Sequence, residues 1–295
     1  MSGGVRLVWG EAFMRYRLSE DHPLQPLRVK LTVELIHELG LVELAELVPP
    51  RVAVDEELRL CHSRDYVELV RSLSEPDLRD GVAWLRAQGH RVACVDVDVH
   101  HGDGTQALFY ADPEVLTVSI HESGRYLFPG TGFPDESGVG AGLGAAANLP
   151  LLPYTWDEPW LAAFEATVPT LLREFKPTIL VTQDGCDSHY LDPLAHLQTS
   201  TGIWPRVGRR FHELAHELCE GRWVATGGGG YAVREVVPRA WTLLFAEMVE
   251  HPEMAAALID TQSFAPPAEA QERVWAALAE DLRRLSEELG IRLSL

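Results

Sequence analysis

Short, nearly continuous apolar runs alternate along the chain with longer amphipathic segments. The apolar runs predict buried strands at residues 5–9, 91–99, 115–120, 178–183 and 222–226. Strands that are covered by helices on both faces lose the polar alternation of half-exposed strands. The amphipathic segments predict helices at residues 26–40, 156–175, 204–219 and 233–250, with Pro169 and Pro238 expected to kink or shift the second and fourth of them. Alternating strands and helices predict an α/β fold with a doubly wound, mostly parallel sheet.

Ionisable residues gather where one of these predicted strands ends. The stretch CVDVDVHHGDGTQ, residues 94–106, contains Asp96, Asp98 and His100 at a spacing of two. On a strand this spacing directs all three side chains to one side. Buried charges are costly unless they are paired or bound to a metal, and parallel sheets bind ligands beyond their carboxyl ends. We therefore predict a metal site with Asp98 and His100 as ligands and Asp96 one step deeper.

A second strand end, TQDGCDSHYLDPLAH, can supply a third ligand, for which we choose Asp187. Asp192 precedes a proline and is interpreted as a turn or cap residue instead. Two carboxylates and one imidazole with an open position favour Zn²⁺ or Fe²⁺, with Mn²⁺ as a further candidate.

Two further stretches bear on the chemistry. In ATGGGGYAV no Lys-Ser/Thr follows the glycines, so a phosphate-binding P-loop is excluded. Tyr231 after these glycines could instead donate a hydrogen bond to a developing oxyanion, or it could be a packed tyrosine after an ordinary turn. The loop in SIHESGRYLFPGTGF contains Tyr126, Phe128 and Phe133, and either walls a pocket or packs as a plain surface loop.

Composition narrows the class of protein. The 295 residues have a net charge of -19, which argues against nucleic-acid binding. Four cysteines without a CxxC pair indicate reduced thiols, and neither a signal peptide nor a membrane-spanning run is recognisable. We expect a cytoplasmic protein that does not interact with membranes. Residues 264–295 predict an amphipathic helix that packs on the rim of the fold, with partner binding as the alternative.

Six motifs together resemble the histone deacetylase superfamily, in particular the bacterial acetoin-utilization (AcuC-type) deacetylases. They are DHPLQPLR, CHSRDYVELV, VDVDVHHGDGT, LTVSIHESGRYLFPGTG, DGCDSHYLDPLAHLQTST and TGGGGY. The resemblance implies one arginase-like domain over residues 1–295, with three α/β/α layers around a central mostly parallel sheet, and zinc-dependent removal of acetyl groups from lysine. It implies zinc ligands Asp98, His100 and Asp187, a carbonyl-polarising Tyr231, acyl-lysine contacts at Phe128 and Leu194, a structural potassium site at Asp96 and Ser119, and an internal channel near Arg28.

One block of the family pattern is missing from this chain. Relatives have a GG-x-HHA segment with two adjacent histidines before the zinc strand, whereas here ELVRSLSEP runs directly into DLRDGVAWLRAQGH. The resemblance places the break near residues 76–80, and the lost block would also carry a strand of the sheet. In the family those histidines transfer protons and are oriented by the aspartates at positions 96 and 103. Since a general base contributes about 10²–10⁴-fold, we expect little turnover.

Three functions follow from these observations. The first is a deacetylase of acetylated proteins in acetoin or acetate metabolism, for which the resemblance suggests acetyl-CoA synthetase as a substrate. The second is a catalytically inactive remnant that still binds metal. The third, a ureohydrolase with two manganese ions, requires additional ligands before Arg91, and no such set is recognisable there.

Overall fold

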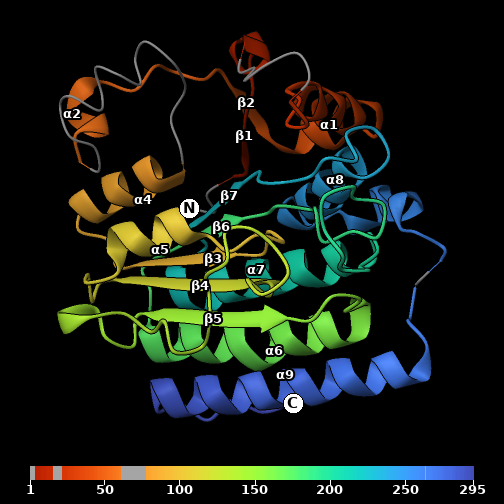
Figure 1. Ribbon diagram of the computed structural model, residues 1–295. Helices are drawn as coiled ribbons and strands as arrows, with labels where there is room; N and C mark the ends of the chain where they lie inside the picture. The colour runs from red at the N-terminus through yellow and green to blue at the C-terminus, as the bar shows by residue number, and fades with distance from the viewer. Residues whose placement is uncertain (1–3, 16–21, 61–77, 263) are drawn as a thin grey trace.

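A five-stranded parallel sheet forms the centre of the protein, with strand order β5-β4-β3-β6-β7. The computed structural model describes residues 4–15, 22–60, 78–262 and 264–295 (Figure 1). The strands are β3 (Val92–Asp96), β4 (Val115–Glu122), β5 (Ala146–Leu151), β6 (Ile179–Gln183) and β7 (Trp223–Thr226). The CHSRDYVELV motif and residues 76 and 77 of the predicted break lie outside the described residues.

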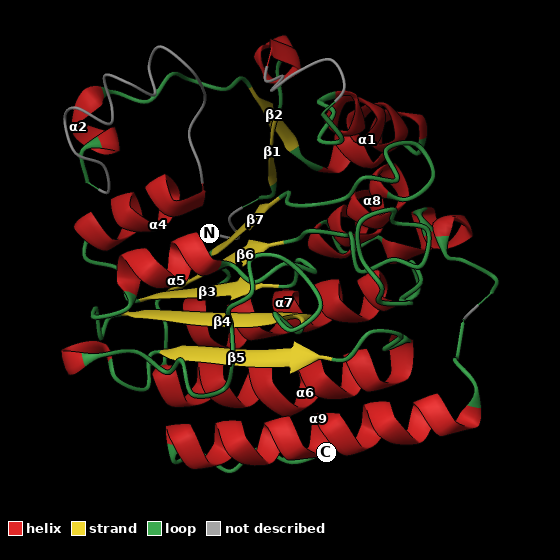
Figure 2. Ribbon diagram, in the orientation of Figure 1, coloured by secondary structure: helices red, strands yellow, loops and turns green. Residues whose placement is uncertain are grey.

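Helices cover both faces of this sheet, as Figure 2 shows. On one face, α4 (Leu78–Ala87) and α5 (Asp103–Phe109) bury Val82, Leu85 and Phe109 against Val92 and Cys94 of β3. On the other face, α6 (Asp157–Phe175) and α7 (Ile203–Cys219) pack a larger core that contains the alternate residues of the same strands. Because helices cover both faces of the sheet, the strands are apolar at nearly every position. The predicted three-layer α/β/α architecture is confirmed.

The remaining helices close the ends of the molecule. These are α1 (Leu27–Glu38), α2 (Asp55–Leu58), α8 (Val237–Met248) and α9 (Ala268–Leu289), with short 3₁₀ turns at Glu11–Arg15, Leu41–Leu44, Gly140–Gly142, Pro252–Met254 and Ala256–Leu258. α9 lies along α6 and β5 (Figure 1) and buries Val274, Leu278, Leu282 and Leu285. The amphipathic tail is therefore a packing helix. Among the described residues no helix has the length and apolar character needed to cross a membrane.

The sequence predictions and the structure differ at several points. The apolar run at residues 5–9 does not join the central sheet, because β1 (Arg6–Val8) pairs with β2 (Glu46–Val48) in a separate two-stranded sheet. β5 escaped prediction because Asn148 and Pro150 interrupt its apolar pattern. The helix predicted from residue 233 begins at Val237, with Pro238 in its first turn. Pro169, in contrast, lies inside an unbroken α6.

Candidate metal centre

The side chains of Asp98, His100 and Asp187 converge beyond the carboxyl ends of β3 and β6. One potential ligand atom from each residue lies within 4.8 Å of the others. Nδ1 of His100 is 3.0 Å from Oδ1 of Asp98 and 3.2 Å from Oδ2 of Asp187. β3 and β6 are neighbours in the sheet, which is why residues almost ninety positions apart in the sequence meet here.

The backbone bends to bring the first two residues together. β3 ends at Asp96, so Asp98 and His100 follow the strand, and the prediction that they share a face of it is wrong. Instead, Oδ1 of Asp96 accepts the N–H of Asp98 at 3.0 Å, and Oδ1 of Asp98 accepts the N–H of His100 at 2.9 Å. These short-range hydrogen bonds are typical of Asx turns. The polar spacing of two is used for a turn rather than for a strand.

The carboxylate oxygens of the site have fixed hydrogen-bond partners. Oδ2 of Asp98 accepts the backbone N–H of Gly229 at 2.6 Å and Nε2–H of Gln183 at 2.9 Å. Oδ1 of Asp187 accepts the backbone N–H of Val99 at 2.9 Å. Such outer contacts orient metal ligands and tune their basicity. Sequence reasoning did not identify Gln183, although its place as the last residue of β6 was a signal.

Burial and mutual charge shape the protonation of these groups. Burial and then the adjacent charge of Asp98 raise the pKa of Asp187 to about 7. Burial also opposes ionisation of Asp98, but its hydrogen bonds with His100 and Gln183 outweigh burial and lower its pKa to about 2. For His100, burial favours the neutral ring, yet both carboxylates raise its pKa to about 10. Two buried carboxylates thus compete for one positive charge, and a divalent cation would compensate both. The donor set and its charge fit such an ion.

Asp96 and Ser119, the predicted structural potassium pair, are direct neighbours across β3 and β4. Both are buried, and burial together with the charge of Asp98 raises the pKa of Asp96 well above its usual range. The hydroxyl of Ser119 is 2.8 Å from Nδ1 of His121. The structure brings the pair together, and potassium binding stays a prediction.

Tyr231 faces the metal centre from the glycine-rich turn after β7. Its ring meets that of His100 edge to face, with centroids 6.4 Å apart. Burial and then the carboxylates of Asp187 and Asp98 raise the pKa of Tyr231, so its hydroxyl retains the proton. That hydroxyl forms no hydrogen bond with the described residues and can donate to a ligand. Asp192 accepts the backbone N–H of Tyr231 at 2.8 Å and that of Leu194 at 3.0 Å, which agrees with its predicted turn role.

The two predicted acyl-lysine contacts are exposed. Phe128 has 77% of its surface exposed and Leu194 has 41%, so neither is part of the core. Glu136 stabilises the loop that carries Phe128, because its Oε1 accepts the N–H groups of Gly132 and Phe133 at 2.8 and 3.0 Å. Its Oε2 accepts Nε2–H of Gln106 at 2.9 Å, which connects the loop to α5.

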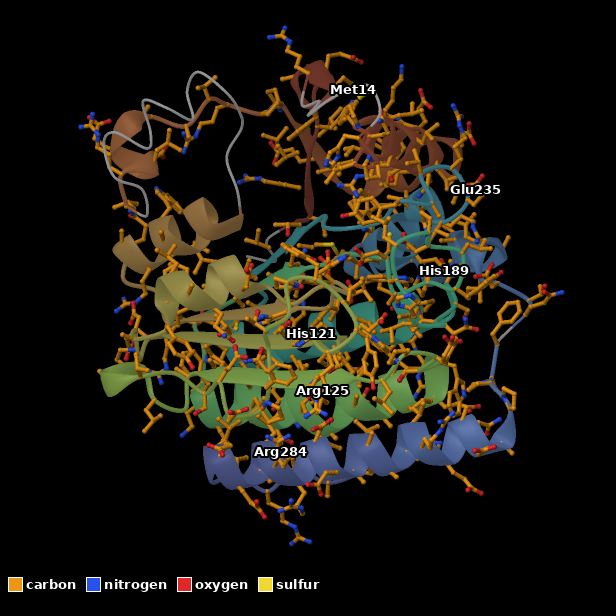
Figure 3. The ribbon with its side chains drawn as sticks, in the orientation of Figure 1. Met14, His121, Arg125, His189, Glu235 and Arg284 are labelled. Carbon is orange, nitrogen blue, oxygen red and sulfur yellow. The ribbon has the colours of Figure 1, made fainter. Side chains whose placement is uncertain are left out.

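Three histidines near the site have structural partners. His101 contacts the hydroxyl of Thr131 at 2.8 Å and the side chain of Gln106 at 3.2 Å. His121 lies within β4, where Nε2 donates to the carbonyl of Gly132 at 2.9 Å, and burial lowers its pKa to about 3. Nε2 of His189, which Figure 3 labels, lies 2.8 Å from Oδ2 of Asp260. The rings of these three histidines have hydrogen-bond partners within the protein, which is typical of structural residues.

A second histidine pair that could transfer protons is absent from the chain. His100 and His101 are the one adjacent pair in the sequence, and His101 is occupied by its two contacts. Asp103, predicted to orient a missing histidine, is exposed at the start of α5, and its carboxylate forms no hydrogen bond with the described residues. Arg28 is buried beside the site and donates from Nη1 to the carbonyl of Gly230 at 3.0 Å.

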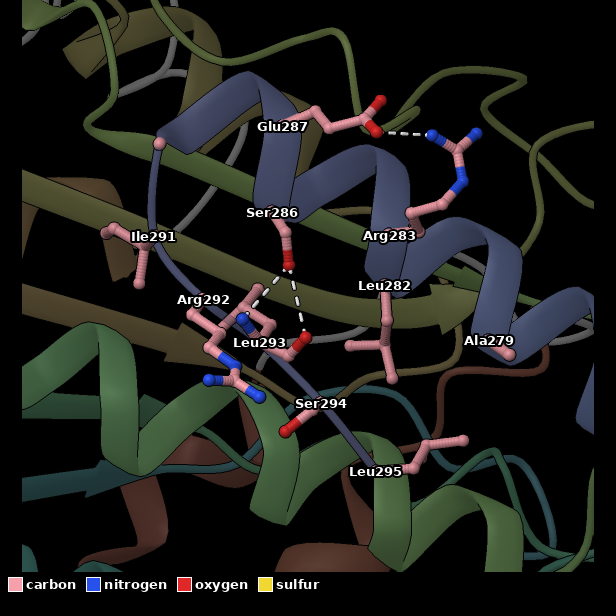
Figure 4. A pocket seen from close by; sticks show the side chains of 11 residues that line it. Ala279, Leu282, Arg283, Ser286, Glu287, Ile291, Arg292, Leu293, Ser294 and Leu295 are labelled. Atoms are coloured by element: carbon pink, nitrogen blue, oxygen red, sulfur yellow. Dashed lines mark hydrogen bonds and ion pairs between the residues drawn. The ribbon is translucent and has the colours of Figure 1, made fainter.

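A hollow of about 620 Å³ lies elsewhere, between the last turns of α9 and the C-terminal residues (Figure 4). Ser286 there donates to the carbonyl of Leu293 at 3.2 Å and accepts its N–H at 3.0 Å. Arg283 pairs with Glu287 on the same helix. These groups satisfy one another, and the hollow is remote from the metal centre.

Comparison with known proteins agrees with the fold and shows the family. A family model described as the histone deacetylase domain matches residues 77–248. The acetoin utilization protein AcuC of Bacillus subtilis is 32% identical over 313 residues, covering 82% of this chain and 81% of the relative. The AcuC protein of Staphylococcus xylosus is 33% identical over 314 residues and covers 82% of each chain. The chain therefore belongs to the histone deacetylase superfamily and is an AcuC-type member of it.

In the alignment with AcuC of Bacillus subtilis, this chain lacks residues that the relative has. Since 82% of the 295 residues is about 242, an alignment over 313 positions contains about 70 at which this chain has no residue. The break near residues 76–80 stays a prediction about where these positions fall.

Proposed function

We propose that this chain is an acetyl-lysine deacetylase by descent whose turnover is impaired by the lack of a proton-transferring histidine pair. The observation that carries the proposal is the convergence of Asp98, His100 and Asp187 beside Tyr231, whose hydroxyl forms no hydrogen bond with the described residues. Zn²⁺ is the expected ion and Fe²⁺ the alternative, because two carboxylates and an imidazole suit both. A bound ion would act as a Lewis acid and lower the pKa of a coordinated water.

The residues of the chain supply the other parts of the chemistry. Tyr231 keeps its proton and can donate a hydrogen bond to the oxygen of an acetyl group as negative charge develops there. Phe128 and Leu194 are exposed and available to contact an acylated lysine side chain. An acetylated protein, with acetyl-CoA synthetase as the candidate, is the proposed substrate.

The proton-transfer step is where this chain is expected to be deficient. His101 and His121 are held by structural contacts, and Asp103 is exposed without a histidine to orient. These observations favour a second candidate function, a metal-binding remnant without hydrolytic activity. Loss of a positioned general base lowers the rate by about 10²–10⁴-fold. The impaired deacetylase and the inactive remnant therefore differ only in how much turnover is left.

The test measures metal content and turnover in the same preparation. The purified protein should bind zinc at the candidate centre. Once loaded with zinc, it should release acetate from an acetyl-lysine peptide at least about 10²-fold more slowly than the Bacillus subtilis relative. Residual turnover that falls further in Tyr231→Phe supports the impaired deacetylase, and metal binding without turnover supports the remnant. Turnover equal to that of the relative would overturn the impairment, and failure of Asp98→Asn to reduce metal binding would overturn the proposed centre.

A further inference from the structure

Two histidines on α7, which are not part of the candidate metal centre, lie one helical turn apart. His212 and His216 lie four positions apart and therefore share one face of the helix. Their ring centroids are 4.7 Å apart and the rings are inclined by 39°. Two histidines at positions i and i+4 share a helix face and are a known arrangement for binding one zinc ion.

A carboxylate just beyond the neighbouring helix lies close to one of these histidines. Glu250 follows the end of α8, and its Oε1 lies 3.7 Å from Nε2 of His212. One helical turn earlier along the contact between α7 and α8, Glu247 is paired with Arg209 at 3.3 Å. Among the described residues, no lysine or arginine nitrogen lies within 4.0 Å of Glu250. Its negative charge is therefore available to a cation that is not part of the protein.

The ring nitrogens at this site are also available. Neither His212 nor His216 forms a side-chain hydrogen bond with the described residues, in contrast to His101, His121 and His189. Glu250 is 79% exposed and His212 is 20% exposed, so an ion can enter from solvent.

We propose that His212, His216 and Glu250 form a second metal site, which binds a divalent late transition-metal ion such as Zn²⁺, Ni²⁺ or Cu²⁺. Imidazole nitrogens suit these ions, and two imidazoles with one carboxylate form a common zinc donor set. The high negative charge of the chain raises the local concentration of cations. Bound metal would link α7 to the end of α8 and stabilise their packing. The proposal is independent of the proposed deacetylase function.

Equilibrium dialysis of metal-stripped protein against ZnCl₂ tests this site. The wild-type protein should bind two equivalents, and the double variant His212→Asn/His216→Asn should lose one of them. Asp98→Asn should lose the other equivalent, and His37→Asn, which removes an exposed histidine of α1, should retain both. The double variant should also lose the zinc-dependent rise in melting temperature that α7–α8 linkage provides.

Electron paramagnetic resonance with CuCl₂ identifies the ligands directly. In Asp98→Asn, the bound Cu²⁺ should show coupling to two imidazole nitrogens, and this signal should disappear when the two α7 histidines are also replaced. An unchanged zinc stoichiometry in the double variant would overturn the second site. If the wild-type protein binds a single equivalent of zinc that is lost only in Asp98→Asn, the second site is overturned and the candidate deacetylase centre is supported. If the single equivalent is lost only in the double variant, the result contradicts the candidate deacetylase centre.

Discussion

The backbone N–H of Gly229 donates a 2.6 Å hydrogen bond to Oδ2 of Asp98, across 131 positions of sequence. The glycine-rich turn after β7 therefore holds a candidate metal ligand through its backbone. A side chain at position 229 would overlap the carboxylate of Asp187, and its Cβ would lie 2.7 Å from Oδ2 of Asp98. The glycine is required by close approach rather than by loop flexibility.

Gly229→Ala should consequently displace both carboxylates and abolish zinc binding at the centre. Zinc content after dialysis and the zinc-dependent shift in melting temperature measure this effect. Gly81→Ala is the matched control, because a Cβ there meets no atom of the described residues within 4 Å. The control lies inside α4 and should leave zinc binding unchanged while stabilising the protein by up to about 1 kcal/mol. Normal zinc binding by Gly229→Ala would contradict the proposed geometry.

Gln183→Ala should weaken zinc binding by about 10–100-fold, the usual effect of removing a group that orients a ligand. The amide of Gln183 both donates to Asp98 and accepts the N–H of Gly185 at 2.7 Å, so it holds the ligand and the following turn together. Competition with a chromophoric chelator gives the zinc affinity. Gln88→Ala, at an exposed position after α4, should retain the wild-type affinity, and an equal loss in both variants would exclude a specific role for Gln183.

Glu136→Ala should loosen the loop that carries Phe128. The substitution leaves the N–H groups of Gly132 and Phe133 without their acceptor and should destabilise the protein by about 1–3 kcal/mol. Chemical denaturation measures the loss, and limited proteolysis should show faster cleavage within the loop. Asp135→Ala is the control, since that exposed side chain forms only a 3.8 Å pair with Arg284 and should cost less than about 1 kcal/mol.

Asp260 should stabilise the fold in a pH-dependent manner. Burial alone would raise its pKa, but hydrogen bonds from the N–H of Thr201, His189 and Arg239 outweigh burial and hold the pKa below its usual range. A carboxyl whose pKa is lowered on folding contributes stability above its unfolded value of about 4, and this contribution is lost as the pH falls through the folded value.

Asp260→Asn should therefore melt at a lower temperature than the wild type at pH 7, with a difference that shrinks below about pH 4. Thermal melts across this range measure the convergence. Glu280→Gln, which alters an exposed pair on α9, should have little effect at any pH. A difference for Asp260→Asn that is independent of pH would indicate lost packing rather than lost charge.

Much of the metal centre could be predicted from local sequence. The spacing of Asp98 and His100 at the end of one predicted strand indicates a site, and Asp187 and Tyr231 follow two further apolar runs; strand ends on one edge of a parallel sheet are close together. The details that failed were those in which a few residues leave regular structure. Asx turns after Asp96 replaced the predicted strand geometry, and the strand that includes His121 continued two residues further than its apolar pattern.

By itself, the sequence determined the class of fold, the residue types at the centre and the absence of a second adjacent histidine pair, because periodicity, spacing and composition are local properties of the chain. Only the tertiary structure decided which groups hold those residues. Gln183 and the backbone of Gly229 reach Asp98 because β3, β6 and β7 are consecutive in the sheet. The juxtaposition of His212 with Glu250 likewise depends on the packing of α7 against α8. Such contacts arise from the register of packed elements, which no local pattern encodes.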